Sequence, residues 1–189
     1  YTAVDRAETE TAQAHAINAV APGILGEAAA ALDALVVHYS TDHVFDGTQE
    51  EAYKESDSPN PQSVYGASKL AGEQALRASG TRHLIFRTSW VVGVHGENFA
   101  KTMLRLAGER SKLNVVADQF GAPTSAALLA DITAHIIRET TEPRHNAFPD
   151  GVYHLTAGGV TNWHEYACHV IELARAAGRP ITIPPGGIR

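Results

Sequence analysis

Short apolar runs alternate along the chain with longer segments in which apolar residues recur every three or four positions. Residues 34–39 form a nearly continuous apolar run of strand length, which is typical of a strand buried on both faces of a parallel sheet. The helical segments have lengths suited to connecting parallel strands. This alternation predicts an α/β fold with a mostly parallel, doubly wound sheet. The expected helices are 8–31 (interrupted at Pro22 and Gly23), 63–79, 98–109, 125–139 and 162–177; the expected strands are 34–39, 83–87, one near Val115, and 152–155.

The longest polar stretch lies between the first strand and the second helix. Residues 46–62 contain Pro59 and Pro61 and show neither helical nor strand periodicity. A loop of this length inside a compact domain is usually functional. We therefore expect it to close over another part of the protein.

The bulk composition narrows the class of protein. A chain of 189 residues corresponds to one domain, or to one domain with a small appendage. Its net charge of −6 gives no basic footprint for nucleic acid, and no apolar run has the length of a membrane span or a signal peptide. The single cysteine, Cys168, excludes an internal disulfide. We expect a cytoplasmic protein with no nucleic-acid or membrane partner.

The segment Tyr65-Gly-Ala-Ser-Lys69 carries candidate chemistry. On a helix, residues four apart share a face, so the Lys69 ammonium is expected beside the Tyr65 phenol. An adjacent cation favours the phenolate and lowers the phenol pKa toward neutrality. Such a group can exchange a proton with an oxygen while hydride moves at carbon. Thr41, at the expected carboxyl end of a strand, adds a hydroxyl where open α/β sheets bind ligands.

Each of these residues also has a structural interpretation. A Tyr and a Lys at this spacing can be a packing contact with a solvated charge. Thr41 can be a cap or turn residue, and Asn18 can bridge backbone groups. Asp42 can stabilise its own loop, and Trp90 can anchor a loop in the core.

A phosphate-binding turn for a dinucleotide is missing from the chain. Such a turn follows a strand and opens a helix, whereas Gly23-Ile-Leu-Gly26 lies inside a helical pattern. The first residues, Tyr1-Thr-Ala-Val-Asp5, resemble the loop after a strand. We therefore expect a fragment that lacks an N-terminal Gly-rich βαβ unit.

The ten histidines raise the question of a metal site. His164 and His169 are five residues apart, so their side chains diverge on a helix, whereas a zinc-protease helix needs a spacing of four. His135, His145 and His154 are scattered without ligand spacing. No metal ligand is predicted.

A series of motifs, in this order along the chain, resembles the dTDP-4-dehydrorhamnose reductase family of extended short-chain dehydrogenases. The resemblance runs from Tyr1 to about Arg179. It implies a Rossmann-type fold, truncated at the N-terminus and at the C-terminal end, with a small C-terminal substrate-binding portion. The motifs are His38-Tyr-Ser-Thr-Asp42, Val44-Phe45, Tyr65-Gly-Ala-Ser-Lys-Leu-Ala-Gly-Glu73, Phe86-Arg-Thr-Ser-Trp90, Asn98-Phe-Ala-Lys-Thr-Met-Leu104, Gly121-Ala-Pro-Thr124 and Tyr153-His-Leu155.

The resemblance implies catalytic roles for four residues. Tyr65 would be the proton donor to the C4 oxygen of a keto-sugar. Lys69 would bind the nicotinamide ribose and tune Tyr65, and Thr41 would hydrogen-bond near the reacting oxygen. Asn18 would support the proton relay. The implied reaction is the NADPH- or NADH-dependent reduction of dTDP-4-dehydro-6-deoxy-L-mannose to dTDP-L-rhamnose.

The resemblance also implies binding roles. Thr2, Tyr65 and Lys69 would contact the cofactor, and Thr41, Asp42 and Trp90 would contact the dTDP-sugar. Residues 1–110 would be a partial cofactor-binding domain, and residues 111–189 would contribute to the substrate-binding portion. The family allows a structural Mg²⁺ and a homodimer, and the residues that select between NADH and NADPH lie outside this chain.

One residue departs from the family pattern, and two alternative functions stay open. His43 stands where the family usually has Tyr after Ser-Thr-Asp, and imidazole titrates near neutrality. Sugar-nucleotide dehydratases place a Glu there, so their acid–base pair is incomplete in this chain. The alternatives are a related sugar-nucleotide epimerase or reductase, and a non-catalytic subunit resembling the regulatory subunit of methionine adenosyltransferase.

Overall fold

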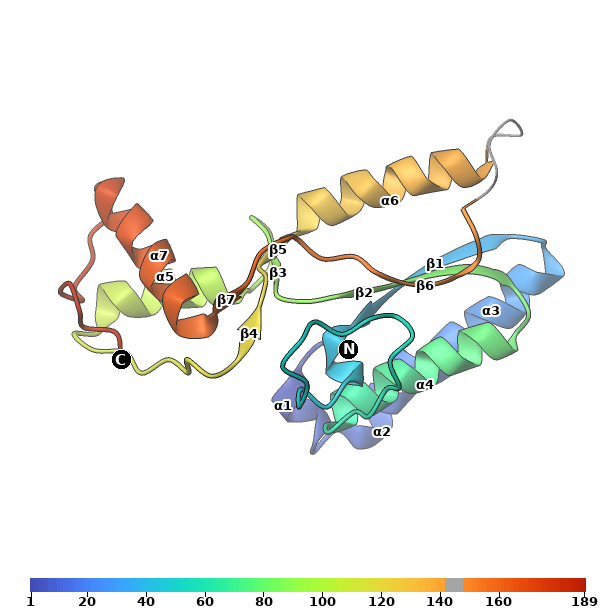
Figure 1. The fold of residues 1–189 in the computed structure, drawn as a ribbon. Coiled ribbons are helices and arrows are strands. Elements are labelled where there is room, and N and C mark those ends of the chain that lie inside the picture. The colour runs from blue at the N-terminus through green and yellow to red at the C-terminus, as the bar shows by residue number, and fades with distance from the viewer. Residues whose placement is uncertain (142–147) are drawn as a thin grey trace. The chain divides into compact units, whose positions relative to one another are not determined.

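The computed structural model describes residues 1–141 and 148–189, which form two compact units (Figure 1). The first unit comprises Tyr1–Thr88 and Ile136–Leu155, and the second comprises Ser89–His135 and Thr156–Arg189. The helix α6 (Ala126–Thr141) begins in the second unit and ends in the first. His145 lies outside the described residues. The predicted boundary at residue 110, between a cofactor-binding and a substrate-binding portion, stays a prediction.

The first unit is built on a parallel sheet of three strands in the order β1–β2–β6. These strands are β1 (Leu35–Thr41), β2 (Arg82–Thr88) and β6 (Gly151–His154). The central strand β2 is buried from Leu84 onward, as expected for a parallel sheet. The predicted α/β class with a parallel sheet is therefore confirmed.

The strand β1 differs from its prediction in burial. It was expected to be buried on both faces, yet it lies at an edge of the described sheet and is only half-buried over most of its length. Tyr39 is 39% exposed. The apolar run predicts the strand itself correctly. Its burial depends on which elements pack beside it, and the sequence of the strand does not contain that information.

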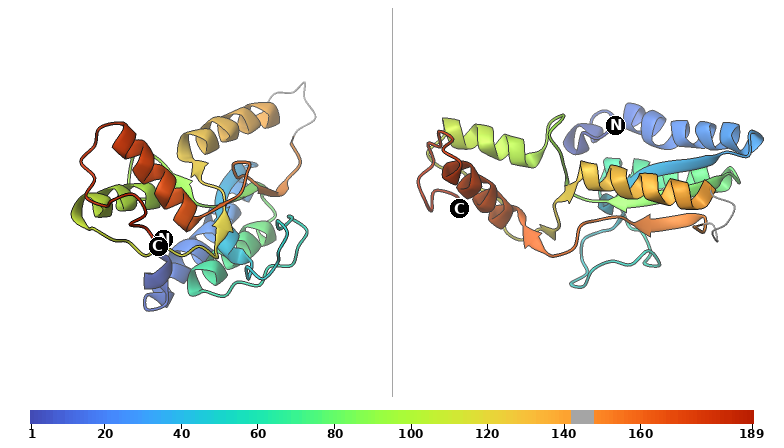
Figure 2. Two further views of the ribbon diagram at one scale, coloured as in Figure 1. Left: turned by 60° about the vertical axis from the view of Figure 1, so that its left-hand side comes forward. Right: turned by 90° about the horizontal axis from the view of Figure 1, so that it is seen from above.

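Helices of the first unit pack on the sheet (Figure 2). α3 (Ala21–Ala31) and α4 (Val64–Ala78) contact each other, and both contact β1. They are preceded by α1 (Val4–Ala7), α2 (Thr11–His15) and the π-helical segment η1 (Ala16–Val20). Pro22 lies in the first turn of α3 directly after η1, and it has no N–H to donate to the preceding turn. The helix therefore continues through Pro22 and Gly23, where an interruption was expected, and the irregularity is the π-helical segment just before them.

Side-chain caps start three helices at the predicted places. Ser63 Oγ accepts the N–H of Gly66 at 3.1 Å at the start of α4. Asn98 Oδ1 accepts the N–H of Lys101 at 3.1 Å before α5 (Phe99–Glu109). Asn162 Oδ1 accepts the N–H of Glu165 at 2.8 Å before α7 (Trp163–Ala176). These caps satisfy amide groups that the helix itself leaves free.

The second unit has an apolar core between α5 and α7. Two short strand pairs accompany it, and both were missed by the sequence pattern: β3 (Val91–Val92) is parallel to β5 (Thr124–Ser125), and β4 (Phe120–Gly121) is antiparallel to β7 (Thr161–Asn162). The expected strand near Val115 is wrong, because only an isolated bridge, Leu113 with Ile188, forms there. The core consists of Met103, Ala107, Leu113, Ala167, Ile171 and Ile183.

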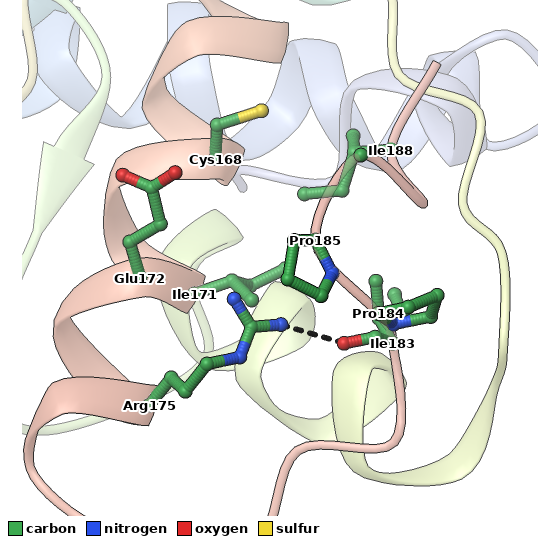
Figure 3. A pocket seen from close by; sticks show the side chains of 9 residues that line it. Cys168, Ile171, Glu172, Arg175, Ile183, Pro184, Pro185 and Ile188 are labelled. Atoms are coloured by element: carbon green, nitrogen blue, oxygen red, sulfur yellow. Dashed lines mark hydrogen bonds between the residues drawn. The ribbon is translucent and has the colours of Figure 1, made fainter.

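The C-terminal segment, residues 181–189, packs against α7. Figure 3 shows a pocket between them, in which Arg175 extends from the helix and donates a hydrogen bond to the carbonyl oxygen of Ile183 at 2.6 Å. None of the described helices combines the length and the apolar composition that a membrane-spanning helix requires.

Candidate active site

Thr41 ends β1 and also caps the short 3₁₀-helix η2 (Asp42–Val44). Its Oγ1 accepts the backbone N–H of His43 at 3.2 Å and donates to Asp42 Oδ1 at 3.0 Å. Thr41 is 5% exposed. The residue therefore has the capping role that its structural interpretation predicts, and its hydroxyl lies at the carboxyl end of a parallel strand.

Tyr65 lies in the first turn of α4 and is half-buried. Its side chain lies beside that of Thr41, and its ring meets that of His43 edge-on with 5.4 Å between centroids. Burial raises the pKa of Tyr65 above its ordinary value; the hydrogen bond with Thr41 opposes this rise, and the charge of Asp42 adds to it. The phenol is therefore protonated at neutral pH.

Lys69 lies one turn after Tyr65 on α4. Its Nζ donates a hydrogen bond to the carbonyl oxygen of Tyr39 at 2.6 Å. Burial lowers the pKa of Lys69, and Glu73 opposes that shift. The expectation that the ammonium lowers the pKa of Tyr65 is wrong in this structure, because burial dominates and Lys69 is not among the causes of the shift.

Asn18 is buried in η1 and bridges two other segments. Its Nδ2 donates to Ser68 Oγ at 3.0 Å and to the carbonyl oxygen of Tyr1 at 3.0 Å. Ser68 Oγ in turn donates to the carbonyl oxygen of Tyr65 at 2.7 Å. Asn18 thus reaches the backbone of Tyr65 through Ser68, which is the bridging role; its part in a proton relay stays a prediction. Thr2 is exposed before α1.

The two remaining predicted residues lie in different units. Asp42 is exposed as a residue, yet desolvation of its carboxylate raises its pKa, against the opposing effects of the His43 charge and the hydrogen bond from Thr41. Trp90 belongs to the second unit, with φ at 47°, and stacks on Trp163 with 3.5 Å between ring centroids. The Trp90 ring lies against Gly121, where a Cβ atom would be 2.7 Å from it. Only Gly leaves room for the ring there.

An aromatic cluster around Trp90 was not predicted. Phe99 lies 4.3 Å from Trp163 and 5.6 Å from Tyr166, measured between ring centroids. Trp163 and Tyr166 are three residues apart on α7, so they share a face. That spacing, directly after the Asn162 cap, is the signal that could have found the cluster.

A buried ion pair was also missed. Arg87 on β2 donates to Glu73 on α4 through Nε at 2.9 Å and through Nη2 at 2.7 Å. Ser40 Oγ donates to the same Glu73 carboxylate. A charged residue at the end of the apolar run 83–87 should have indicated a partner, because Arg is almost never fully buried unless it is paired.

No candidate metal site accompanies these residues. Across residues 1–141 and 148–189, no group of three or more His, Cys, Asp or Glu side chains could hold a metal ion.

The architecture of the first unit, a parallel sheet with helices packed on it, is that of a Rossmann-like domain. The family model described as the RmlD substrate binding domain matches residues 1–185. The chain belongs to this family.

Relatives and solved structures agree with this assignment. The dTDP-4-dehydrorhamnose reductase of Salmonella typhimurium is 53% identical over 178 residues, which are 94% of this chain and 58% of the relative. The crystal structure of the Bacillus anthracis reductase in complex with NADP has a TM-score of 0.86 at 38% identity, covering 97% of this chain and 61% of that chain. The Clostridium acetobutylicum reductase also has a TM-score of 0.86, at 37% identity, covering 100% and 61%. The chain thus spans about three fifths of their length.

Proposed function

We propose that this chain is the catalytic part of an NADPH- or NADH-dependent reductase that converts dTDP-4-dehydro-6-deoxy-L-mannose to dTDP-L-rhamnose. The observation that carries the proposal is the placement of the Tyr65 side chain beside that of Thr41, with Lys69 one turn further on α4. Membership of the RmlD family and similarity to named reductases support it. The same similarity does not favour the epimerase and the regulatory subunit as alternatives.

Tyr65 is the proton donor in this proposal. Because its pKa is raised, the phenol is protonated at neutral pH, as a reduction requires. Tyr65 gives its proton to the sugar C4 oxygen as the carbonyl becomes a hydroxyl, and the phenolate then regains a proton from solvent. Thr41 turns its single hydroxyl proton from Asp42 Oδ1 to the same oxygen and holds it. Asn18 supports the relay through Ser68 and the backbone of Tyr65.

The chain offers donors that fit a nicotinamide nucleotide. An ammonium has three N–H donors, and Lys69 uses one on the carbonyl oxygen of Tyr39, so two are left for ribose hydroxyls. The exposed hydroxyl of Thr2 is a further contact. When bound, the nicotinamide supplies the hydride that reduces the carbonyl carbon.

The proposed sugar contacts are Asp42, Thr41 and Trp90. Residues 1–110 would provide the cofactor contacts, and residues 111–189 would add to the substrate-binding portion, where Gly121 packs on the Trp90 ring. The proposed location is the cytoplasm, because its reducing conditions suit a chain with a single free cysteine.

The test is a Tyr65→Phe substitution in the full natural protein that contains these residues. We expect kcat to fall about 10²- to 10⁴-fold because the proton donor is lost, while the KM for the keto-sugar changes little. Lys69→Ala should lower both kcat and cofactor affinity.

The control for this test is Tyr153→Phe. It removes a hydroxyl that donates to the carbonyl oxygen of Pro149, and it should leave the rate near that of the wild type. Near-normal turnover by Tyr65→Phe would refute the proposed mechanism.

A further inference from the structure

The pair formed by Glu73 and Arg87 is the best-buried ion pair among the described residues. The two side chains are 3% and 6% exposed, and two parallel hydrogen bonds join them. Removing such charges from water costs free energy that their attraction only partly returns, so apolar residues of similar volume are often equally stabilising. Stability alone therefore does not explain the pair, and its geometry suggests another role.

The pair joins α4, which carries Tyr65 and Lys69, to β2, and Ser40 adds the strand β1, which ends at Thr41. Glu73 lies one turn after Lys69 and two turns after Tyr65, on the same side of α4. Its carboxylate accepts from Ser40, the residue directly before Thr41, and Arg87 lies opposite Ser40 in the sheet register. The side chains of Tyr65 and Thr41 therefore meet between α4 and β1, two of the three elements that this network joins.

Arg87 also fixes the segment that follows Thr41. Its guanidinium carbon lies 5.1 Å from the centroid of the Phe45 ring, and Phe45 comes directly after η2. Phe45 in turn stacks on Tyr53 of the polar loop with 4.3 Å between centroids. The third nitrogen of the guanidinium, Nη1, is buried and has no hydrogen-bond partner. One side chain thus contacts α4 and the segment that carries Asp42.

We propose that Glu73, Arg87 and Ser40 form a positioning network that sets the register between the helix bearing Tyr65 and Lys69 and the strand that ends at Thr41. This inference rests on the proposed function. Apolar contacts are non-directional and allow neighbouring elements to slide, whereas a bidentate guanidinium–carboxylate pair fixes both distance and angle. A displacement of about 1 Å can cost about 10²-fold in rate.

The first test is Arg87→Lys in the full natural protein. Lysine keeps the charge and loses the planar fork that makes two parallel bonds. We expect kcat to fall about 10- to 100-fold, with little change in the KM for NADPH and for the sugar. The primary isotope effect on kcat, measured with NADPH deuterated at the transferred position, should rise because hydride transfer becomes more rate-limiting.

The matched control is Arg105→Lys. Arg105 pairs with Glu109 at 3.1 Å, but both side chains are more than half exposed. The chemical change is identical and the geometry is solvent-screened, so kcat and the isotope effect should stay at their wild-type values.

A double substitution, Glu73→Leu with Arg87→Met, separates positioning from stability. It replaces the pair by apolar side chains of similar volume, so we expect a Tm near or above that of the wild type, with kcat still reduced and the isotope effect still raised. Wild-type kcat and isotope effect in this variant would overturn the inference. So would a loss of kcat in both variants that is accompanied by weakened binding of both NADPH and the sugar.

Tyr65→Phe distinguishes failure of this inference from failure of the proposed function. If Tyr65→Phe keeps its rate, the proposed function fails. If Tyr65→Phe loses turnover while Arg87→Lys behaves as the wild type, only the positioning network fails.

Discussion

The two units hold their candidate site residues by different means. In the first unit, Thr41 and Lys69 are fixed by hydrogen bonds, and a buried ion pair lies on the same helix and sheet. In the second, Trp90 is held by ring stacking on Trp163 and by a close approach to Gly121. Proton transfer depends on distances and angles that polar contacts define, whereas a stacked ring tolerates small shifts. The kind of contact therefore matches the task proposed for each unit.

The largest contrast is expected between two helical glycines. A Cβ atom at Gly72 on α4 would lie 2.0 Å from the backbone oxygen of Asn18, so Gly72→Ala must separate α4 from η1. We expect a loss of several kcal/mol in the free energy of unfolding, because overpacking costs about 1–3 kcal/mol and here the obstacle is backbone. Chemical denaturation measures it.

Gly108 on α5 is the counterpart in the second unit. Its added Cβ would meet nothing closer than 3.7 Å. Gly108→Ala should therefore stabilise the protein by up to about 1 kcal/mol, since Ala is the better helix former. Equal losses in both variants would show that close helix packing does not distinguish the units.

The second contrast concerns pH. Burial, and then the charge of Lys69, lower the pKa of His38 to about 4, while Glu73 opposes the shift. The Nε2 atom of His38 is buried and has no hydrogen-bond partner. Because the pKa in the unfolded chain is higher, about 6.5, the unfolded state binds more protons between these values. The stability tied to neutral His38 is complete above pH 6.5 and is lost as pH falls toward 4, by up to about 3 kcal/mol.

The measurement is the unfolding free energy at pH 7 and at pH 4.5. His38→Leu should reduce the difference between the two values. His169 is exposed on α7 in the second unit, and His169→Gln is the control that should preserve it. An unchanged pH dependence in His38→Leu would contradict the assignment.

The smallest effect is expected at the aromatic cluster. Trp163→Ala removes the stacking partner of Trp90 and should raise the KM for the dTDP-sugar about 2- to 10-fold, the value of one aromatic pair. Trp163→Phe keeps a ring and should retain most of the affinity. Steady-state kinetics decides the point: a fall in kcat at constant KM would mean that this cluster, like the network around Arg87, positions the reacting groups.

Local chemistry explains why most helices were predictable. Ser63, Asn98 and Asn162 are caps whose side chains accept amide protons three residues later, so the start of each helix is encoded beside it. The strand expected near Val115 failed because its backbone partner is distant: the N–H of Val115 donates to the carbonyl oxygen of Arg189. The spacing of apolar residues around Val115 cannot predict a backbone hydrogen bond to a residue so far along the chain.

The candidate site was predictable to a similar degree. Tyr65, Lys69 and Thr41 follow from spacing and strand position, and the structure brings Thr41 and Tyr65 into contact. The direction of the Tyr65 pKa shift was not predictable, because it depends on burial and on the turn of Lys69 toward Tyr39. The link from Glu73 to Arg87 joins residues whose pairing depends on how α4 crosses the sheet.

The position of β6 in the sheet has a consequence for synthesis on the ribosome. β2 pairs with β1 and with β6, yet β6 follows β2 by roughly sixty residues. At about 5–20 residues per second, the apolar centre of β2 waits on the order of 3–12 s for its second neighbour. During that interval the nascent chain exposes an open edge of Leu84, Ile85 and Phe86, side chains that are 0–1% exposed once folded. This strand is where a chaperone would be expected to bind first.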